Sequence, residues 1–315
     1  MPHRGGASLP DFPTLGDAGD LADCRAKTRY PQLMFRLAAA LLCCMFVNPE
    51  GLLRAAEAPG KTFALVVGIS QYKVLPRDLW LQYPDADAKM FSEFLASPRG
   101  GSTPSNQVMM LVNEQATTGA IRNAFKTFLK DKPGKNDTVY ILVAGHGTVD
   151  AHGAYILTYD SDPANLGDTS LPMAELRALV EQQLNTAGHV ILLADVCRAA
   201  TIAGQKSSAI GGVVEQIGEA PGELLGLMAA RPKELSNEGP EYGGGHGAFT
   251  YSLLRALDGG ADADKDGAVT SGEVIDFVTK DVSKLTGNRQ HPRDFGTMDG
   301  ALRLSDLSRP GIKVP

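Results

Sequence analysis

The sequence predicts an α/β fold with a mostly parallel central sheet and helices on both faces. Short, unbroken apolar runs alternate, from Lys61 onward, with segments whose apolar residues recur every three or four positions. Glycine and proline separate the two kinds of segment. Strands that alternate with helices imply crossover connections, and unbroken apolar runs are typical of parallel strands buried on both faces.

The elements follow one another in a regular order along the chain. Buried strands are predicted at 63–69, 108–112, 138–144 and 190–194, with a small hairpin strand at 155–159, a fifth strand at 223–230 and a sixth at 301–304. Amphipathic helices are predicted at 87–95, 118–129 and 173–184. Ligands bind outside the carboxyl ends of strands in open sheets of this kind, so the residues after each strand are the first to inspect.

Composition limits the function. The chain has 315 residues, of which 43% are hydrophobic, and a formal net charge of -6. This is enough for one substantial core. The acidic balance and the absence of a block rich in Lys and Arg argue against nucleic-acid binding as the main task. A locally acidic pocket for a basic substrate remains compatible with these numbers.

The N-terminal segment differs from the rest. Residues 1–32 are rich in Gly, Pro, Asp and Arg without apolar periodicity, and are predicted to be disordered. Within 33–58, the run 37–47 is continuously apolar and follows Arg36. It is shorter than the roughly 20 residues of a membrane-spanning helix, which favours an export signal, or a membrane anchor if it is not cleaved. We therefore expect a periplasmic or secreted protein; the alternative is a buried helix of the folded domain.

Cysteine usage isolates one thiol. Three of the four cysteines, Cys24, Cys43 and Cys44, lie in the first 50 residues, and Cys197 lies beyond them. A lone cysteine has no partner for a disulfide within its own domain. It is either a buried, inert side chain or a nucleophile beside a suitable histidine.

One short motif contains such a histidine, and a second contains Cys197. Gly145-His146-Gly147 follows the third predicted buried strand, and Asp195-Val196-Cys197-Arg198 follows the fourth. Neighbouring strands lie about 4.8 Å apart, so the two motifs are expected to face one another. A histidine there can deprotonate the thiol and later protonate a leaving amine. The backbone N–H groups of Gly147 and Cys197 are the candidate oxyanion donors.

These motifs, in this order, resemble those of the caspase and metacaspase family. The resemblance includes the first strand from Phe63 to Tyr72, the acidic start of the next helix at 85–88, and the late segment 245–251. It covers Lys61 to Leu304. It implies the caspase-hemoglobinase fold over a domain of residues 61–305, and a cysteine endopeptidase with His146 as general base and acid and Cys197 as nucleophile.

The resemblance also implies a specificity. Metacaspase-like members cleave after Arg or Lys and use acidic residues in the specificity pocket, which correspond here to Asp87 and Asp195. A carboxylate pair suits a desolvated guanidinium. The alternative roles are a structural hydrogen-bond acceptor for Asp195 and a helix N-terminal charge for Asp87. The chain departs from the usual metacaspase pattern at Ala144 and Arg198, which concerns the specificity more than the catalytic pair.

Three further histidines compete with His146. His152 and His246 are also followed by glycine, but neither follows an unbroken apolar strand. His189 precedes a strand and therefore belongs to the opposite edge of the sheet. We expect solvated or packed roles for these three, although His246 could still line the site.

A second candidate site is contiguous in sequence. Residues 262–273 have the spacing of an EF-hand loop, with carboxylates at loop positions one, three, five and twelve and glycine at position six. The predicted Ca²⁺ ligands are Asp262, Asp264, Asp266, the Ala268 carbonyl, Thr270 and Glu273. Hard oxygen ligands suit Ca²⁺ better than a transition metal. The alternative is a solvated acidic turn.

Three hypotheses from different classes follow. The first is an exported cysteine endopeptidase that acts on proteins or peptides after Arg or Lys, with no organic cofactor. The second is a catalytically silent caspase-like scaffold, and the third is a calcium-binding interaction protein. None of them involves nucleic acid, and a membrane enters only through an uncleaved N-terminal segment.

Overall fold

The computed structural model describes residues 60–198, 223–231 and 234–315, and the side chains of Cys197 and Arg198 are outside this description. The described residues belong to one compact unit. Residues 1–32 and 33–58 lie outside them, so the expected disorder and export signal stay predictions. Within the described ranges, no helix is both long enough and apolar enough to cross a membrane.

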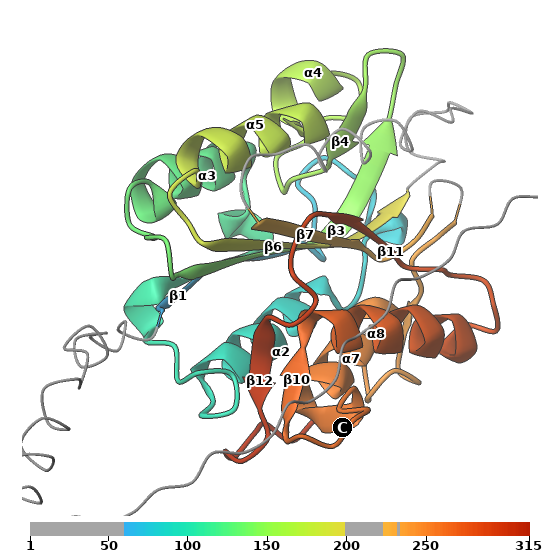
Figure 1. The fold of residues 1–315 in the computed structure, drawn as a ribbon. Helices are drawn as coiled ribbons and strands as arrows, with labels where there is room; N and C mark the ends of the chain where they lie inside the picture. The colour runs from blue at the N-terminus through green and yellow to red at the C-terminus, as the bar shows by residue number, and fades with distance from the viewer. Residues whose placement is uncertain (1–59, 199–222, 232–233) are drawn as a thin grey trace, which may run out of the picture. The chain divides into compact units, whose positions relative to one another are not determined.

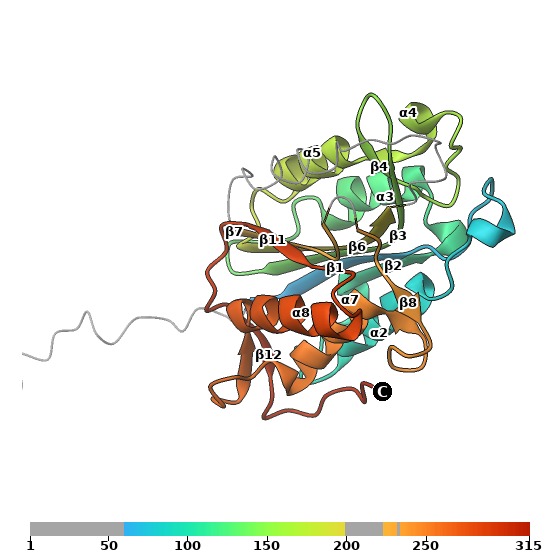
Figure 2. The same ribbon diagram turned by 90° about the vertical axis from the view of Figure 1, so that its right-hand side faces the viewer.

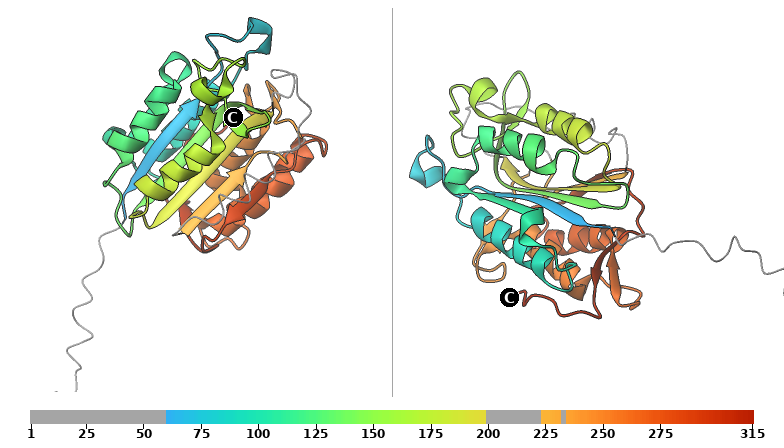
Figure 3. Two further views of the ribbon diagram at one scale, coloured as in Figure 1. Left: turned by 90° about the horizontal axis from the view of Figure 1, so that it is seen from above. Right: turned by 90° about the vertical axis from the view of Figure 1, so that its left-hand side faces the viewer.

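A single sheet runs through the centre of this unit (Figures 1 and 3). Its strands lie in the order β11-β7-β6-β3-β1-β2. Outside this order, β4 pairs with the last residues of β3, and β5 pairs with β4. All pairs from β7 to β2 are parallel, whereas β11 is antiparallel to β7. The expected α/β fold with a mostly parallel sheet is therefore confirmed.

The strands have the following bounds. They are β1 (Thr62–Gly68), β2 (Val108–Val112), β3 (Thr138–Val149), β4 (Ala154–Ile156), β5 (Leu171–Pro172), β6 (His189–Arg198), β7 (Glu223–Met228), β8 (Glu238–Gly239), β9 (His246–Gly247), β10 (Ala268–Thr270), β11 (Arg293–Gly296) and β12 (Arg303–Asp306). The helices are α2 (Pro84–Ala96), α3 (Thr118–Asn123), α4 (Leu166–Thr169), α5 (Met173–Gln183), α7 (Ala248–Arg255) and α8 (Ser271–Leu285). The described residues also form the short 3-10 turns η3 (Arg77–Leu79), η4 (Ser105–Gln107) and η5 (Asn113–Gln115) and the π-helical turns η6 (Ala124–Leu129) and η7 (Ala256–Gly260).

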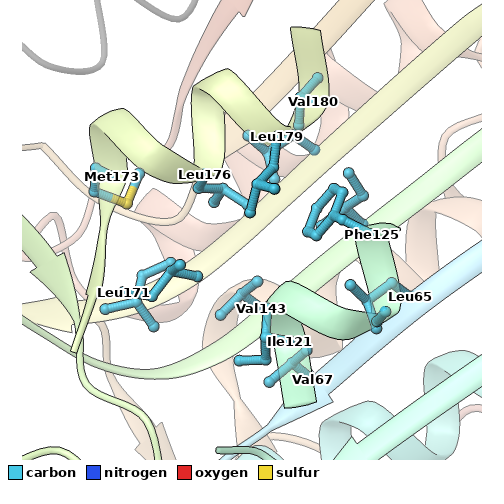
Figure 4. Close-up of a cluster of buried hydrophobic side chains, with 14 of the residues drawn as sticks. Leu65, Val67, Ile121, Phe125, Val143, Leu171, Met173, Leu176, Leu179 and Val180 are labelled. Atoms are coloured by element: carbon cyan, nitrogen blue, oxygen red, sulfur yellow. The ribbon is translucent and has the colours of Figure 1, made fainter. Parts of the chain in front are cut away.

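Helices cover both faces of the sheet. In Figure 1, α3, α4 and α5 lie above it, and α2, α7 and α8 lie below it; Figure 2 shows the same two layers from the side. Figure 4 shows Leu176 and Leu179 of α5 and Phe125 of η6 packed over strand residues such as Val143. A second buried cluster, which includes Phe91 of α2, fills the other face. Two cores of this kind explain why the strands read as unbroken apolar runs.

The junction between β1 and α2 positions one candidate site residue. Gly68 ends β1, and a Cβ atom at this position would lie 2.2 Å from the Pro84 carbonyl oxygen. Only glycine permits this approach, which sets the first turn of α2 against the carboxyl end of the sheet. Pro84 is the first residue of α2, where its missing N–H carries no penalty. Asp87, in that first turn, therefore lies beside the end of β1.

Two strands are longer than predicted. β3 was expected to end at Ala144 and β6 at Ala194, but the β3–β6 ladder continues to the pair Gly147 and Arg198. The expectation that the two motifs lie in loops after these strands is therefore wrong. Antiparallel pairing of β4 with the last residues of β3 extends the regular structure past the end of the apolar run.

The predicted sixth strand is also placed differently. Residues 303–306 form β12, which pairs with β10 in a separate two-stranded sheet and not with the central sheet. The position beside β7 belongs to β11, which the sequence did not signal because it is short and polar. Val269 of β10 is fully buried, and this burial holds the small sheet against the α7 and α8 layer.

Candidate active site

The carboxyl ends of β3 and β6 bring the predicted catalytic pair together. His146 and Cys197 are direct Cα partners in the parallel ladder. Adjacent strands lie about 4.8 Å apart, so the ladder itself fixes the spacing of the two backbones. Asp195 lies one pair earlier, opposite Ala144.

The His146 ring is held in one tautomer. Its Nε2 lies 2.7 Å from the Leu79 carbonyl oxygen at the end of η3. A carbonyl only accepts hydrogen bonds, so Nε2 carries the proton and Nδ1 keeps its lone pair when the ring is neutral. Nδ1 is buried and has no hydrogen-bond partner among the described side chains. This nitrogen is therefore the one suited to act as a base.

Tyr72 contacts His146 through both its hydroxyl group and its ring. Its hydroxyl accepts a hydrogen bond of 2.8 Å from the His146 backbone N–H and donates one of 3.1 Å to the Ile69 carbonyl. The two rings stack with centroids 5.2 Å apart. Burial lowers the pKa of the His146 imidazole, although the bond to Leu79 acts in the opposite direction. Near neutral pH, the ring is accordingly in its basic form.

The two predicted pocket acids lie on the α2 and α7 side of the sheet. Asp87 is 2% exposed and Asp195 is 6% exposed. Ser236 donates to Asp195 Oδ1 at 2.6 Å, and Thr250 of α7 donates to Oδ2 at 2.9 Å. Burial raises the pKa of Asp195 against the effect of these two bonds.

Asp87 has a different partner. His246 Nδ1 lies 2.7 Å from Asp87 Oδ1, and the Gly247 N–H donates to both carboxylate oxygens at 3.3 and 3.1 Å. Burial raises the pKa of Asp87 to about 7; the His246 hydrogen bond opposes this rise and the charge of Asp195 adds to it.

The two acids converge over one glycine. A Cβ atom built on Gly247 would lie 2.6 Å from Asp195 Oδ2 and 3.0 Å from Asp87 Oδ2. Any larger residue at this position would clash with the Asp195 carboxylate and press against that of Asp87. Among the described side chains, neither acid has a lysine or arginine partner.

More negative charge surrounds this pair. Glu238 of β8 accepts the backbone N–H groups of Gln82 and Tyr83, and burial raises its pKa. The charge of Asp195 and that of Asp85 raise the Glu238 pKa further. The site is thus a buried cluster of acids next to the His146 and Cys197 pair of the β3–β6 ladder.

Sequence reasoning found His146, Cys197, Asp87 and Asp195 but assigned an ordinary role to His246. The structure packs His246 against Asp87, which agrees with a packed role and with the alternative that it lines the site, but not with a solvated role. His189 lies at the amino end of β6 and pairs with Glu223, as its position before a strand implied. Tyr72 and the Leu79 carbonyl were missed, and a carbonyl leaves no signal in a sequence.

The predicted calcium loop forms as a compact turn between η7 and α8. Oxygen atoms of Asp262, Asp264 and Glu273 lie within 4.8 Å of one another. Asp262 Oδ1 is buried without a hydrogen-bond partner among the described residues, while Oδ2 accepts from the Gly267 N–H at 3.3 Å. Gly267 has a φ of 84°, which suits the glycine expected at loop position six.

Of the other predicted ligands, the side chains of Asp266 and Thr270 have partners outside this cluster or at its edge. Asp266 accepts from the Ala268 N–H at 2.8 Å and meets Arg303 at 3.4 Å, away from the three clustered acids. Thr270 and Glu273 form a capping box at the start of α8. Burial would raise the pKa of Glu273, but hydrogen bonds from Thr270 and Ala263 hold it below its ordinary value.

The sheet order and its two helical layers define a caspase-like α/β scaffold, with a histidine and a cysteine in register at the carboxyl end of its central strands. The family model described as the caspase domain of peptidase C14 matches residues 61–299. The chain therefore belongs to the caspase-domain peptidase family. Family membership supports a peptidase-type scaffold and implies protein substrates.

A solved structure agrees with this assignment at the level of the fold. The chain is similar to protein GSU0716 from Geobacter sulfurreducens, with a TM-score of 0.53 and 20% sequence identity. The match covers 80% of this chain and 100% of the other. No curated protein sequence matches the chain.

Proposed function

We propose that this protein is a cysteine endopeptidase with a His146/Cys197 dyad that cleaves peptide bonds after Arg or Lys. The observation that carries the proposal is the register of His146 with Cys197 at the carboxyl end of the sheet, together with a buried Nδ1 that keeps its lone pair. A general base beside a thiol is the arrangement that nucleophilic catalysis by cysteine requires.

The chemistry follows from this arrangement. His146 Nδ1 takes the proton of the Cys197 thiol, and the thiolate attacks the scissile carbonyl carbon. The C–N bond breaks as the imidazolium gives its proton to the leaving amine. Water, deprotonated by the same ring, then hydrolyses the thioester and restores the thiol. The N–H groups of Gly147 and Cys197 are the proposed donors to the oxyanion.

The acidic pocket supports the specificity for basic residues. Asp87 and Asp195 are buried, converge over Gly247 and have no lysine or arginine partner among the described side chains. Buried carboxylates are costly unless a cation is paired with them. A guanidinium or ammonium group of the substrate is a cation of the right kind, and Arg can bond both carboxylates at once.

The test compares peptides that are identical except for the residue before the cut, which is Arg, Lys, citrulline or Asp. Citrulline keeps the shape of Arg and removes its charge. We expect turnover of the Arg and Lys peptides only, loss of turnover in Cys197→Ala, and normal turnover in the matched control Cys24→Ala. Turnover that survives in Cys197→Ala, or an Asp preference, would contradict the proposal.

The silent-scaffold alternative predicts a different result. A correctly folded wild-type protein would then cleave none of the four peptides, with or without Ca²⁺. A thiol-reactive probe sharpens the distinction, because an activated Cys197 thiolate reacts faster near neutral pH than an ordinary thiol. Labelling at Cys197 that disappears in His146→Ala would favour the peptidase.

The same proposal includes Ca²⁺ binding by the loop of residues 262–273. The clustered oxygens of Asp262, Asp264 and Glu273, and the buried, unpartnered Asp262 Oδ1, support it. These residues supply the hard oxygen donors that Ca²⁺ takes. A calcium titration followed by isothermal calorimetry tests this part, and no heat of binding at millimolar Ca²⁺ would contradict it.

Export is the last part of the proposal, and it rests on the sequence of residues 33–58 alone. Cell fractionation of the full chain, compared with a variant that lacks 33–58, tests it. We expect the full chain outside the cytoplasm, either free or membrane-bound, and the truncated chain inside.

A further inference from the structure

His246 occupies an unusual place for a residue outside the catalytic pair. It lies in β9, directly before α7, and is 6% exposed. Its Nδ1 is 2.7 Å from Asp87 Oδ1, although the two residues are 159 positions apart in the chain. The contact therefore joins the first turn of α2 to the segment directly before α7, beside Asp195.

The two oxygen atoms of the Asp87 carboxylate have different hydrogen-bond partners. His246 Nδ1 contacts Oδ1 only, whereas the Gly247 backbone N–H donates to both Oδ1 and Oδ2. Among the described residues, Oδ2 accepts only from the Gly247 N–H, and both it and Asp195 Oδ2 approach Gly247 closely. Asp195 is anchored separately by Ser236 and Thr250. His246 is thus the side chain that fixes how Asp87 is turned relative to Asp195.

The charges around Asp87 give His246 a second role. Asp195 faces Asp87 from β6 and His246 faces it from β9. On α2 itself, Asp85 is bound to Ser70 and Asn113, and from β8 Glu238 is bound to the backbone of Gln82 and Tyr83. Every other ionisable group in this set is an acid, so His246 is the side chain here that holds Asp87 without adding negative charge.

We propose that His246 is a positioning residue of the pocket, which orients Asp87 toward Asp195 and thereby sets the affinity for a basic substrate side chain. This inference rests on the proposed specificity for Arg and Lys, and extends it to a third residue. His246 acts through Asp87 and not on the scissile bond, so its effect belongs to substrate binding.

The Asp87 carboxyl gives the role a pH dependence. Burial raises the pKa of Asp87 to about 7, so near neutral pH the empty pocket holds a proton that a guanidinium must displace. The binding of a basic side chain is therefore expected to release a proton and to weaken as the pH falls from 8 to 6.

The test measures KM and kcat for the Arg peptide in His246→Ala and His246→Asn. Asn places an N–H donor where His places Nδ1, so it should rescue the contact. We expect His246→Ala to raise KM by about 10- to 100-fold with little change in kcat, the pattern of a lost interaction with a bound cation. We expect KM and kcat of His246→Asn to lie within about threefold of the wild-type values.

The matched control is His189→Ala. His189 also holds a carboxylate through Nδ1, at 2.7 Å from Glu223, but at the opposite end of β6. A purely structural loss would lower kcat or stability for all peptides and would not be repaired by Asn. An unchanged KM for the Arg peptide in a folded His246→Ala protein would overturn the inference.

A binding measurement keeps the inference testable without turnover. Agmatine carries the guanidinium without a peptide bond, and it should raise the melting temperature of wild type and His246→Asn but not of His246→Ala. This pattern without any peptide cleavage would reject the peptidase and retain the role of His246. Agmatine stabilisation that is equal in all three proteins would reject the role of His246 and leave the peptidase standing. No stabilisation of the wild type would reject the acidic pocket itself and the His246 inference with it.

Discussion

The chain gathers carboxylates in two places, and the two are built differently. The pocket acids Asp87 and Asp195 are nearly inaccessible and come from segments more than a hundred residues apart. The loop acids Asp262, Asp264 and Glu273 are partly or fully exposed and come from one turn of 12 residues. In the pocket, fixed donors hold each acid; in the loop, the acids mostly cap their own backbone.

This difference separates two ways to hold a cation. A buried pair with few waters gains most from a cation that brings its own apolar stem and directional donors, such as an Arg side chain. An exposed loop with backbone-ordered oxygens suits a small hard ion that keeps part of its hydration. Each prediction below acts on one of the two sites and leaves the other unchanged.

The largest expected effect comes from Asp195→Asn, which removes a charge without changing the shape of the pocket. We expect kcat/KM for the Arg peptide to fall by about 100- to 1,000-fold, the loss that follows when one partner of a buried charge pair is neutralised. Steady-state kinetics check this, with exposed Asp168→Asn as the control. An effect under about threefold would mean that Asp195 only supports the backbone.

The next effect concerns stability and pH. The pKa of Asp87 is raised from its ordinary value of 3.8 to about 7, so the folded chain binds this proton more tightly than the unfolded chain. The stabilisation is complete below pH 4 and is lost as the pH rises through 7. Between pH 5 and pH 8, the free energy of unfolding of the wild type should fall by up to about 3 kcal/mol more than that of Asp87→Asn.

Urea unfolding at the two pH values measures this difference. Asp168→Asn, which changes an exposed acid, should follow the wild-type pH dependence. Added agmatine should reduce the wild-type loss at pH 8, because it pairs with the ionised carboxylate. Parallel pH profiles for wild type and Asp87→Asn would show that Asp87 ionises as an ordinary acid.

A smaller effect is expected in the loop. Glu273→Gln removes one charged ligand but retains a side chain that can complete the capping box with Thr270. We expect Ca²⁺ affinity to fall by about 10- to 100-fold, while the start of α8 stays intact. Calorimetric titration checks this against Asp276→Asn, one helical turn further on. Arg-peptide binding should be the same in all three proteins, and a large change there would show that the two sites are coupled.

The smallest effect is expected from Arg303→Gln. Arg303 lies 3.4 Å from Asp266, and both side chains are about half exposed or more, so the pair contributes under about 1 kcal/mol. Removing the competing cation should strengthen Ca²⁺ binding by about twofold, a gain that high salt erases. Weaker binding would mean that Arg303 supports the loop through β12.

The contrast also explains what the sequence could predict. The loop could be predicted from the sequence alone, because its candidate ligands are contiguous and their spacing is the signal. The structure clusters Asp262, Asp264 and Glu273, and Ca²⁺ binding stays a prediction. The fold and His146 with Cys197 were predictable because unbroken apolar runs mark parallel strands and the motifs follow them directly. Asp87 and Asp195 were assigned through a family resemblance, since no local pattern relates positions so far apart.

Other parts of the site depend on tertiary structure. Leu79 contributes a carbonyl, which every residue possesses, so nothing in its side chain could have identified it. His246 follows three glycines in a segment without apolar periodicity, and only the packing of α7 against α2 brings it to Asp87. The extension of β3 and β6 was missed because glycine, histidine and aspartate interrupt the apolar pattern just where pairing continues.

That continued pairing of β3 and β6 has a consequence for how the protein can diversify. His146 and Cys197 are spaced by backbone rungs and not by the segments that follow them, so insertions after Val149 or Arg198 leave the distance between the two backbones unchanged. Those segments can then acquire new lengths and substrate contacts while the chemistry is inherited intact. A deletion of one residue within 138–146 would instead shift every rung and separate base from nucleophile.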